Sequence, residues 1–160
     1  MRLLIKNKIF SLADGSSVTD ENGTPQFYVK GKVFSATRKK RITDTAGNPL
    51  YLVRNKFWRL LRHACLIYDA NGEKIAKVQS KISFRKKFTV IGYTDEIRID
   101  GDIIARNFTV YRGDLAIGTL KQHFMVMSDT YLLDCFNDDD APFLVALVIA
   151  VDNILDRQKD

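Results

Sequence analysis

An apolar segment near the C-terminus, residues 142–151, constrains the possible folds of this chain more than any other part of its sequence. A short apolar run fits either a strand or a buried helix, but Ile154 and Leu155 extend this one beyond an ordinary strand. Its β-branched residues favour a strand. Its flanks favour a helix, because the acids of Asp138–Asp140 and a proline suit a first helical turn. Length and flanks together predict a helix over residues 141–156.

A helix that is apolar on every side lies either in a protein core or in a membrane. Crossing a bilayer takes roughly 20 apolar residues, and Asp152 and Asn153 interrupt this run well before that length. We therefore predict a buried helix and no transmembrane span. Because only a closed or nearly closed sheet surrounds a single helix on all sides, the rest of the chain must supply such a sheet.

The first half of the chain repeats a unit of 24 or 25 residues, marked by lysines at positions 8, 32, 56 and 81. Three units contain the pattern Asp-x-x-Gly, at Asp20–Gly23, Asp44–Gly47 and Asp69–Gly72. In such a pattern the carboxylate accepts hydrogen bonds from backbone amides two residues on, and the glycine takes the positive φ of a hairpin exit. Alternating β-forming residues flank each turn, so each unit is predicted to be a hairpin plus a crossing strand of an antiparallel meander.

A period in this range also fits a solenoid, but a solenoid does not enclose a lone hydrophobic helix. The second half continues with strand-like segments separated by turns such as Asp100–Asp102, which brings the total to about twelve strands. We predict a mainly β fold, a closed antiparallel β-barrel of about twelve strands enclosing one hydrophobic C-terminal helix. With no linker or low-complexity tract, residues 1–160 are expected to form one domain.

The repeated units, together with the segments Ser128–Asp134 and Ala146–Asp152, resemble the LURP-one-related family. Members of that family share the tubby C-terminal-like fold, and the resemblance extends over essentially the whole chain. It implies a β-barrel with the C-terminal helix threaded through its centre. Tubby proteins with this fold are held at membranes through phosphoinositide headgroups, and phospholipid scramblases look related. The resemblance therefore implies a lipid-associated role, although no tubby lipid-binding residue is carried over to a position of this sequence.

The charges of the chain are strongly segregated along its length. Residues 30–90 hold 16 lysines and arginines against 3 acids, a local net charge of +13. Residues 91–160 hold 6 against 13, a local net charge of −7. This asymmetry indicates a basic face for phosphate-bearing or acidic partners. The alternative is a solvated strand surface, since lysines on strands also discourage pairing between sheet edges.

Two basic clusters occupy corresponding places in the second and fourth units. They comprise Arg38, Lys39, Lys40 and Arg41 in the first case, and Arg85, Lys86 and Lys87 in the second. Because equivalent loops of a meander barrel emerge at one end, we expect the clusters to converge on an anionic phospholipid headgroup or another phosphorylated ligand. Near an anionic membrane each cation contributes about 1 kcal/mol. The alternative is two solvated turns with no ligand.

Other partners and the location of the protein follow from simpler features. Nucleic acid is not favoured, because it requires exposed aromatic side chains for stacking, and the phenylalanines near the clusters are expected to point inward. A protein-interaction scaffold, in which charge serves solubility, is the second hypothesis. The N-terminal segment lacks the apolar core of a secretory signal, and Cys65 and Cys135 lack CxxC spacing. We expect a cytoplasmic protein with reduced thiols, peripheral at the membrane.

The sequence contains no recognisable catalytic motif. His63 and Cys65 would share one face of a strand, but no third orienting group or ligand cluster accompanies them. Asn137–Asp140 offers oxygen ligands for calcium, but it lacks EF-hand spacing, and helix capping explains it better. Arg112–Asp114 spells an integrin tripeptide and is better explained as a hairpin turn. We expect a binding protein rather than an enzyme, with no catalytic residue, metal or cofactor.

Overall fold

The computed structural model describes residues 1–6, 15–31, 38–56, 64–81, 87–103, 107–125 and 128–157. These residues form twelve strands followed by a short 3-10 turn and one helix. The elements are β1 (Arg2–Lys6), β2 (Ser16–Asp20), β3 (Pro25–Gly31), β4 (Lys40–Thr43), β5 (Pro49–Asn55), β6 (Ala64–Asp69), β7 (Lys74–Lys81), β8 (Lys87–Gly92), β9 (Ile97–Asp102), β10 (Asn107–Arg112), β11 (Leu115–Met125), β12 (Ser128–Cys135), η2 (Asp138–Asp140) and α1 (Ala141–Arg157).

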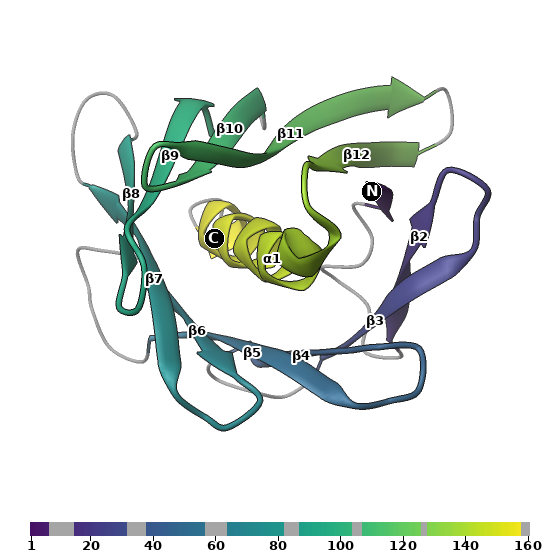
Figure 1. Ribbon diagram of the computed structural model, residues 1–160, viewed down its shortest axis with the longest axis horizontal. Coiled ribbons are helices and arrows are strands. Elements are labelled where there is room, and N and C mark those ends of the chain that lie inside the picture. The colour runs from purple at the N-terminus through teal and green to yellow at the C-terminus, as the bar shows by residue number, and fades with distance from the viewer. Residues whose placement is uncertain are drawn as a thin grey trace.

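The strands form one antiparallel sheet that curves around α1 (Figure 1). Its order is β8-β7-β6-β5-β4-β3-β2-β1-β12-β11-β10-β9, so β1 joins the two halves by pairing with both β2 and β12. This confirms the prediction of a twelve-stranded antiparallel barrel around the C-terminal helix. The barrel is nearly closed rather than closed, because the two edge strands β8 and β9 are not hydrogen-bonded to each other.

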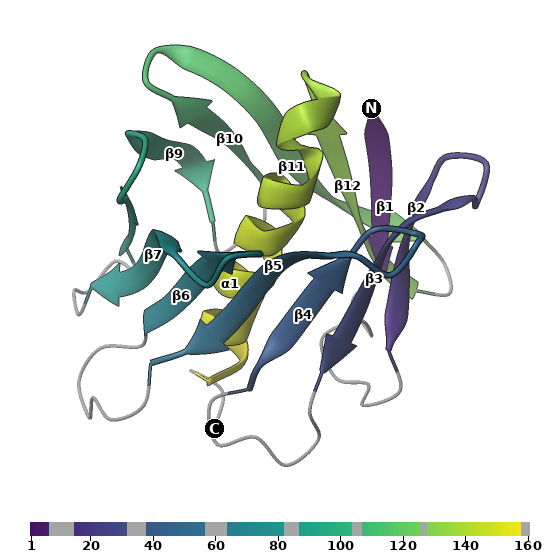
Figure 2. The same cartoon turned by 60° about the horizontal axis from the view of Figure 1, so that its bottom comes forward.

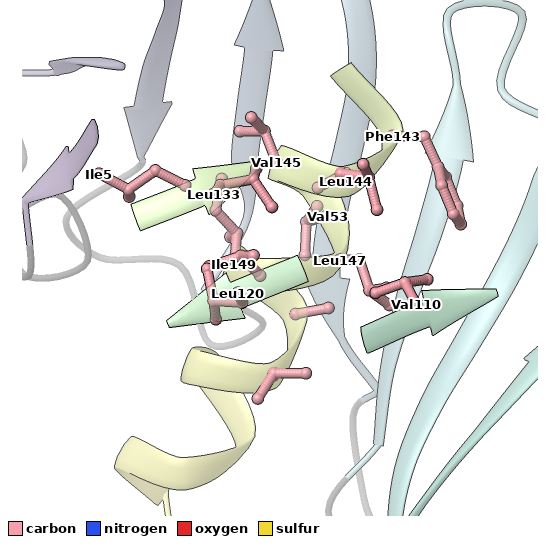
Figure 3. Packing of buried hydrophobic residues seen from close by; sticks show 14 of the residues in the cluster. Ile5, Val53, Val110, Leu120, Leu133, Phe143, Leu144, Val145, Leu147 and Ile149 are labelled. Atoms are coloured by element: carbon pink, nitrogen blue, oxygen red, sulfur yellow. The ribbon is translucent and has the colours of Figure 1, made fainter. Parts of the chain in front are cut away.

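The helix fills the interior of the barrel. Each described side chain from Phe143 to Leu155 is buried, and Leu144, Leu147 and Ile149 are 0% exposed. Figure 3 shows residues of α1 lying among wall residues such as Val53 from β5, with others from β10, β11 and β12. Among the described residues, no helix has both the length and the apolar character that a membrane crossing requires. The predicted core helix is confirmed, and it ends one residue later than expected.

The Asp-x-x-Gly motifs form the turns predicted from the sequence. The Asp20 carboxylate accepts hydrogen bonds from the amides of Asn22 and Thr24, both at 2.9 Å. The Asp69 carboxylate repeats this arrangement with the amides two and four residues on, at 2.9 and 2.8 Å. The three turn glycines have φ between 82° and 90°. Each turn therefore satisfies its own backbone donors, which fixes the register of the strands on either side.

Gly47→Ala is expected to lower the free energy of unfolding by about 1 kcal/mol, because a side chain is strained at the φ of 90° that this residue adopts. The added Cβ would meet no atom within 4 Å, so the cost comes from the backbone alone. Urea denaturation measures it. Ala46→Ser, in the same exposed turn, is the control and should change stability by less than about 0.5 kcal/mol. Equal stability of the Gly47→Ala variant and the original protein would contradict this account of the turn.

The antiparallel meander gives the barrel two chemically different ends. At one, which we call the turn end, lie the Asp-x-x-Gly turns and the start of α1. At the other, the loop end, β3 and β7 end, β4 and β8 begin, and α1 ends. Figure 2 shows α1 running from the turn end to the loop end. Strand direction alone therefore places the starts of β4 and β8, which carry Lys40 and Lys87, at the same end of the barrel.

Candidate functional site

The charge asymmetry along the sequence becomes an asymmetry across the barrel. The basic segment, residues 30–90, begins at the end of β3 and extends into β8. The strands β3 to β8 follow one another in the sheet. The acidic segment, residues 91–160, supplies β9 to β12 and α1. Because the sheet order follows the chain order within each half, one side of the wall is basic and the opposite side is acidic. We call the wall formed by β3 to β8 the basic half.

The first predicted cluster divides between the surface and the interior. Arg38 and Lys39 precede β4 and are exposed, and Arg38 adopts a φ of 43°. Along β4, alternation directs Arg41 outward, where it is exposed, and Lys40 inward, where it is 7% exposed and engaged in contacts. Three of the four cations therefore remain accessible to a ligand, and Lys40 belongs to the interior.

The second predicted cluster lies largely outside the described residues. Arg85 and Lys86 are not described, and Lys87 is described only as the first residue of β8, opposite Lys81 in the sheet. Three strands separate β8 from β4. At about 4.8 Å between neighbouring strands, the two strand starts lie about 19 Å apart along the wall. The starts of β4 and β8 share one end of the barrel, and the distance between them exceeds the reach of one small headgroup.

The outer face of the basic half carries a hollow of about 440 Å³ over β4, β5 and β6. Its floor follows the strand register, because Arg41 is opposite Leu52 and Leu52 is opposite Tyr68. The adjacent residues along the same strands, Ile42, Val53 and Ile67, are 0% exposed and face the core. Because side chains alternate along a strand, Arg41, Leu52 and Tyr68 face outward. The residues that line it are Arg41, Pro49, Tyr51, Leu52, Arg54, Tyr68, Asp69, Ala70 and Gly72. We call it the outer hollow.

Arg54 is held against Tyr68 within the outer hollow. Its Nε and Nη2 donate hydrogen bonds of 3.0 and 2.6 Å to the Tyr68 hydroxyl oxygen, and its guanidinium carbon lies 4.7 Å from the ring centroid. The arginine covers the outward face of Tyr68, which is only 7% exposed. In the part of the chain that the structure describes, neither Arg41 nor Arg54 forms an ion pair with a carboxylate.

Arg54 and Tyr68 are absent from the residues that the sequence pointed to. They lie 14 positions apart and meet only through the pairing of β5 with β6. The available signal was weak: Arg54 alternates with the buried residues Val53 and Asn55, which marks it as outward. Its partner could be found only once the register was known.

The remaining candidates have structural roles where they are described. Asn137 caps the turn η2 by accepting a hydrogen bond of 3.1 Å from the Asp139 amide, so an asparagine rather than an aspartate provides the cap. Arg112 ends β10 at the turn into β11, as expected of a hairpin. His63 lies outside the described residues. Its predicted neighbour Cys65 is fully buried, with its thiol 3.3 Å from the Arg54 carbonyl oxygen.

The second cysteine is buried in an environment that disfavours its thiolate form. Burial raises the pKa of the Cys135 thiol to about 12. Since the thiolate is the nucleophile, a thiol with this pKa stays protonated at neutral pH and has little nucleophilic or metal-binding character. Both cysteines are buried, and no disulfide joins them. The geometry at these positions favours packing over catalysis.

Comparisons with known proteins agree with the architecture. The profile of the LURP-one-related family matches residues 1–152. The crystal structure of a protein from Arabidopsis thaliana is similar, with a TM-score of 0.62 and 22% identity, covering 96% of this chain and 90% of that one. At this identity the likeness shows a shared fold alone. The comparison with curated proteins gave no match.

Proposed function

This chain belongs to the LURP-one-related family, and we propose that it is a non-enzymatic binding module that engages anionic phospholipid headgroups through its basic half. The observation that carries the proposal is the contiguous run of basic strands, β3 to β8, facing away from an acidic half. Exposed cations at Lys30, Arg38, Lys39 and Arg41 lie together where β3 leads into β4. Such a surface would place the protein at the cytoplasmic face of a membrane as a peripheral component.

Electrostatics determines both how strongly the protein binds an anionic membrane and which side of the barrel faces the lipid. Each cation near an anionic surface contributes about 1 kcal/mol, so four contribute about 4 kcal/mol, roughly a thousandfold in partitioning. The acidic half is repelled by the same surface, so the barrel is expected to bind with its basic half toward the lipid. Because exposed charges are screened within about 10 Å at moderate ionic strength, binding must weaken as salt is added.

Replacement of Arg38 and Lys39 by glutamine is expected to reduce association with anionic vesicles about thirtyfold, as two of these contributions are removed. Flotation with phosphatidylcholine vesicles, with and without phosphatidylserine, at low and high salt, measures the effect. The matched control replaces Lys6 and Lys121, two exposed lysines outside the basic half, by glutamine and should bind like the original protein. Equal recovery on neutral vesicles, or binding that salt does not alter, would rule the mechanism out.

A protein-interaction scaffold is the second candidate. The observation that favours it is the open edge of the barrel at β8 and β9, since an unpaired strand edge is a template for another strand. Exposed apolar side chains accompany this edge and the turn end, with Tyr93 52%, Phe136 59% and Leu115 70% exposed. Binding of a purified protein partner in the absence of lipid, together with failed flotation, would favour this function over the first.

A further inference from the structure

We infer that the outer hollow binds one phosphate monoester group through Arg41, Arg54 and Tyr68, which deepens the proposed function and rests on it. The site is on the wall of the barrel, over β4 to β6, and Arg41 is the one member of the predicted clusters that lines it. Its volume of about 440 Å³ is large enough for a phosphate and the polar group that carries it.

The hydrogen-bonding groups of the three residues are nearly all donors. A tyrosine hydroxyl has one donor hydrogen and two acceptor sites, and Arg54 fills the acceptor sites of Tyr68 with two hydrogen bonds. The hydroxyl hydrogen takes no part in these two bonds, and neither do the hydrogens of Arg54 that do not point at Tyr68. Arg41 adds a second guanidinium, whose five N–H groups only donate. A ligand for this set must offer several acceptor oxygens and negative charge.

The one acid that lines the outer hollow, Asp69, narrows the class of anion that the site is expected to bind. Asp69 lines the hollow, and its Oδ1 is occupied by the amides of Asn71 and Glu73. Two guanidiniums and one carboxylate give the hollow a net charge of +1, so charge alone attracts an anion only modestly. The choice between anions must therefore depend on hydrogen bonding. A phosphate monoester presents three terminal oxygens and close to two negative charges at neutral pH, whereas a phosphodiester presents two oxygens and one charge. The monoester matches the donors better.

The site is also held in place before a ligand arrives. Tyr68 is buried, and Arg54 lies over its ring with two hydrogen bonds to its hydroxyl. The guanidinium of Arg54 therefore loses little conformational freedom when an anion binds. Arg41 is on β4, across Leu52 from Tyr68, and it lines the same hollow as Arg54, so an exposed guanidinium and a held one share the site. An anion in the hollow would therefore be bound by one preorganised arginine, Arg54, and one mobile arginine, Arg41.

The test uses the full chain, a soluble probe and vesicles. Glycerol 3-phosphate, a monoester, is titrated while amide signals are followed by NMR, and methyl sulfate is the comparison anion. We expect saturable binding of the phosphate that weakens as pH falls below its second pKa of about 6. Arg54→Gln should weaken it at least about tenfold, as expected for a hydrogen bond to a charged group. Lys121→Gln, an exposed cation on the acidic half, is the matched control.

Two further variants keep the inference testable if Arg54→Gln fails to fold. Tyr68→Phe removes only the hydroxyl, and Arg41→Gln changes an exposed side chain; both should weaken binding of glycerol 3-phosphate by several-fold. Vesicles containing phosphatidic acid, a monoester, or phosphatidylglycerol, a diester, at equal surface charge identify the source of the phosphate. Preference for phosphatidic acid that Tyr68→Phe abolishes would assign the site to a lipid headgroup.

The outcomes separate the site from the broader proposal. Saturable binding of glycerol 3-phosphate that depends on Arg54, without flotation on either anionic vesicle, supports the outer hollow and assigns it a free phosphate compound, while the membrane proposal fails. Equal flotation on both anionic vesicles, unchanged by Tyr68→Phe, overturns the inference and leaves the membrane proposal intact. A response to glycerol 3-phosphate no stronger than to methyl sulfate, or equally reduced by Lys121→Gln, also overturns it.

Discussion

Leu147→Asp is expected to prevent this protein from folding. Leu147 is 0% exposed, in the middle of α1, with strands of the barrel on several sides of it (Figure 3). A carboxylate at this position would be buried without a cation or hydrogen-bond donor, which costs several kcal/mol even after the surroundings relax. Whole domains are stable by only about 5–15 kcal/mol, so this loss is comparable to the total. Circular dichroism and the yield of soluble protein measure the outcome.

The same chemical change at an exposed leucine provides the control. Leu115 begins β11 and is 70% exposed, so Leu115→Asp removes an apolar side chain from solvent contact and buries no charge. It should change the free energy of unfolding by less than about 1 kcal/mol. A soluble Leu147→Asp variant that unfolds at the same temperature as the Leu115→Asp variant would show that α1 does not lie in the core.

The parts of the fold that the sequence predicted are those decided by local chemistry. The helix follows from the length of one apolar run, and the turns follow from an aspartate and a glycine three residues apart. In the turn at Asp44, the carboxylate accepts a hydrogen bond of 2.8 Å from the amide of Asn48, and Gly47 has the required positive φ. These interactions involve neighbours in the chain, so they need no knowledge of the rest of the structure. The enclosing barrel then follows from the need to cover the helix.

The parts that escaped prediction depend on register and on the outcome of competing interactions. Lys40 belongs to a basic cluster in the sequence, yet in the inward–outward alternation of β4 it occupies an inward position. The pattern of charges does not reveal which residues of the strand point inward. Asp152 and Asn153 break the apolar run and are nevertheless 2% exposed. The Asn153 side chain lies 4.0 Å from the Cys65 thiol, so its neighbour in space comes from a strand 88 positions earlier.

The candidate site shows the same division. Arg41 was among the predicted residues, because a run of four cations is visible in the sequence. Arg54 and Tyr68 became candidates only through the pairing of Leu52 with Tyr68 in adjacent strands. Cations that are scattered along the chain come together on a sheet when the register places them on one face. A search for binding sites in meander barrels should therefore compare outward positions across neighbouring strands.

Arg112 joins three segments at the turn end of the barrel. It is the last residue of β10, and its Nη1 donates a short hydrogen bond to the carboxylate of Asp140, which directly precedes α1. Its Nε lies 3.3 Å from a carboxylate oxygen of Asp95, in the connection between β8 and β9. This second contact is an ion pair without hydrogen-bond geometry, since Nε has no hydrogen-bond partner. Arg112 thus bridges the seam between the edge strands and the start of the helix.

Arg112→Leu is expected to lower the free energy of unfolding by about 3–5 kcal/mol, because it leaves the carboxylate of Asp140 buried without its cation. Asp140 is 6% exposed, so water cannot replace the lost partner without a local rearrangement. The control is Arg98→Leu. Arg98 stacks on Tyr111 and pairs with Asp100 at 3.6 Å, but both charged groups are more than half exposed, so we expect a loss of about 1 kcal/mol. Urea denaturation measures both variants.

A double variant tests the cause of the loss. If the penalty comes from the uncompensated carboxylate, adding Asp140→Leu to Arg112→Leu removes the buried charge and should recover a large part of the stability, since a buried ion pair replaced by apolar groups is often nearly neutral. If Arg112 acts mainly by packing against Phe143, whose ring centroid is 5.8 Å from its guanidinium carbon, the second change should recover nothing. Equal losses for Arg112→Leu and Arg98→Leu would mean that the stability of the barrel does not depend on this bridge.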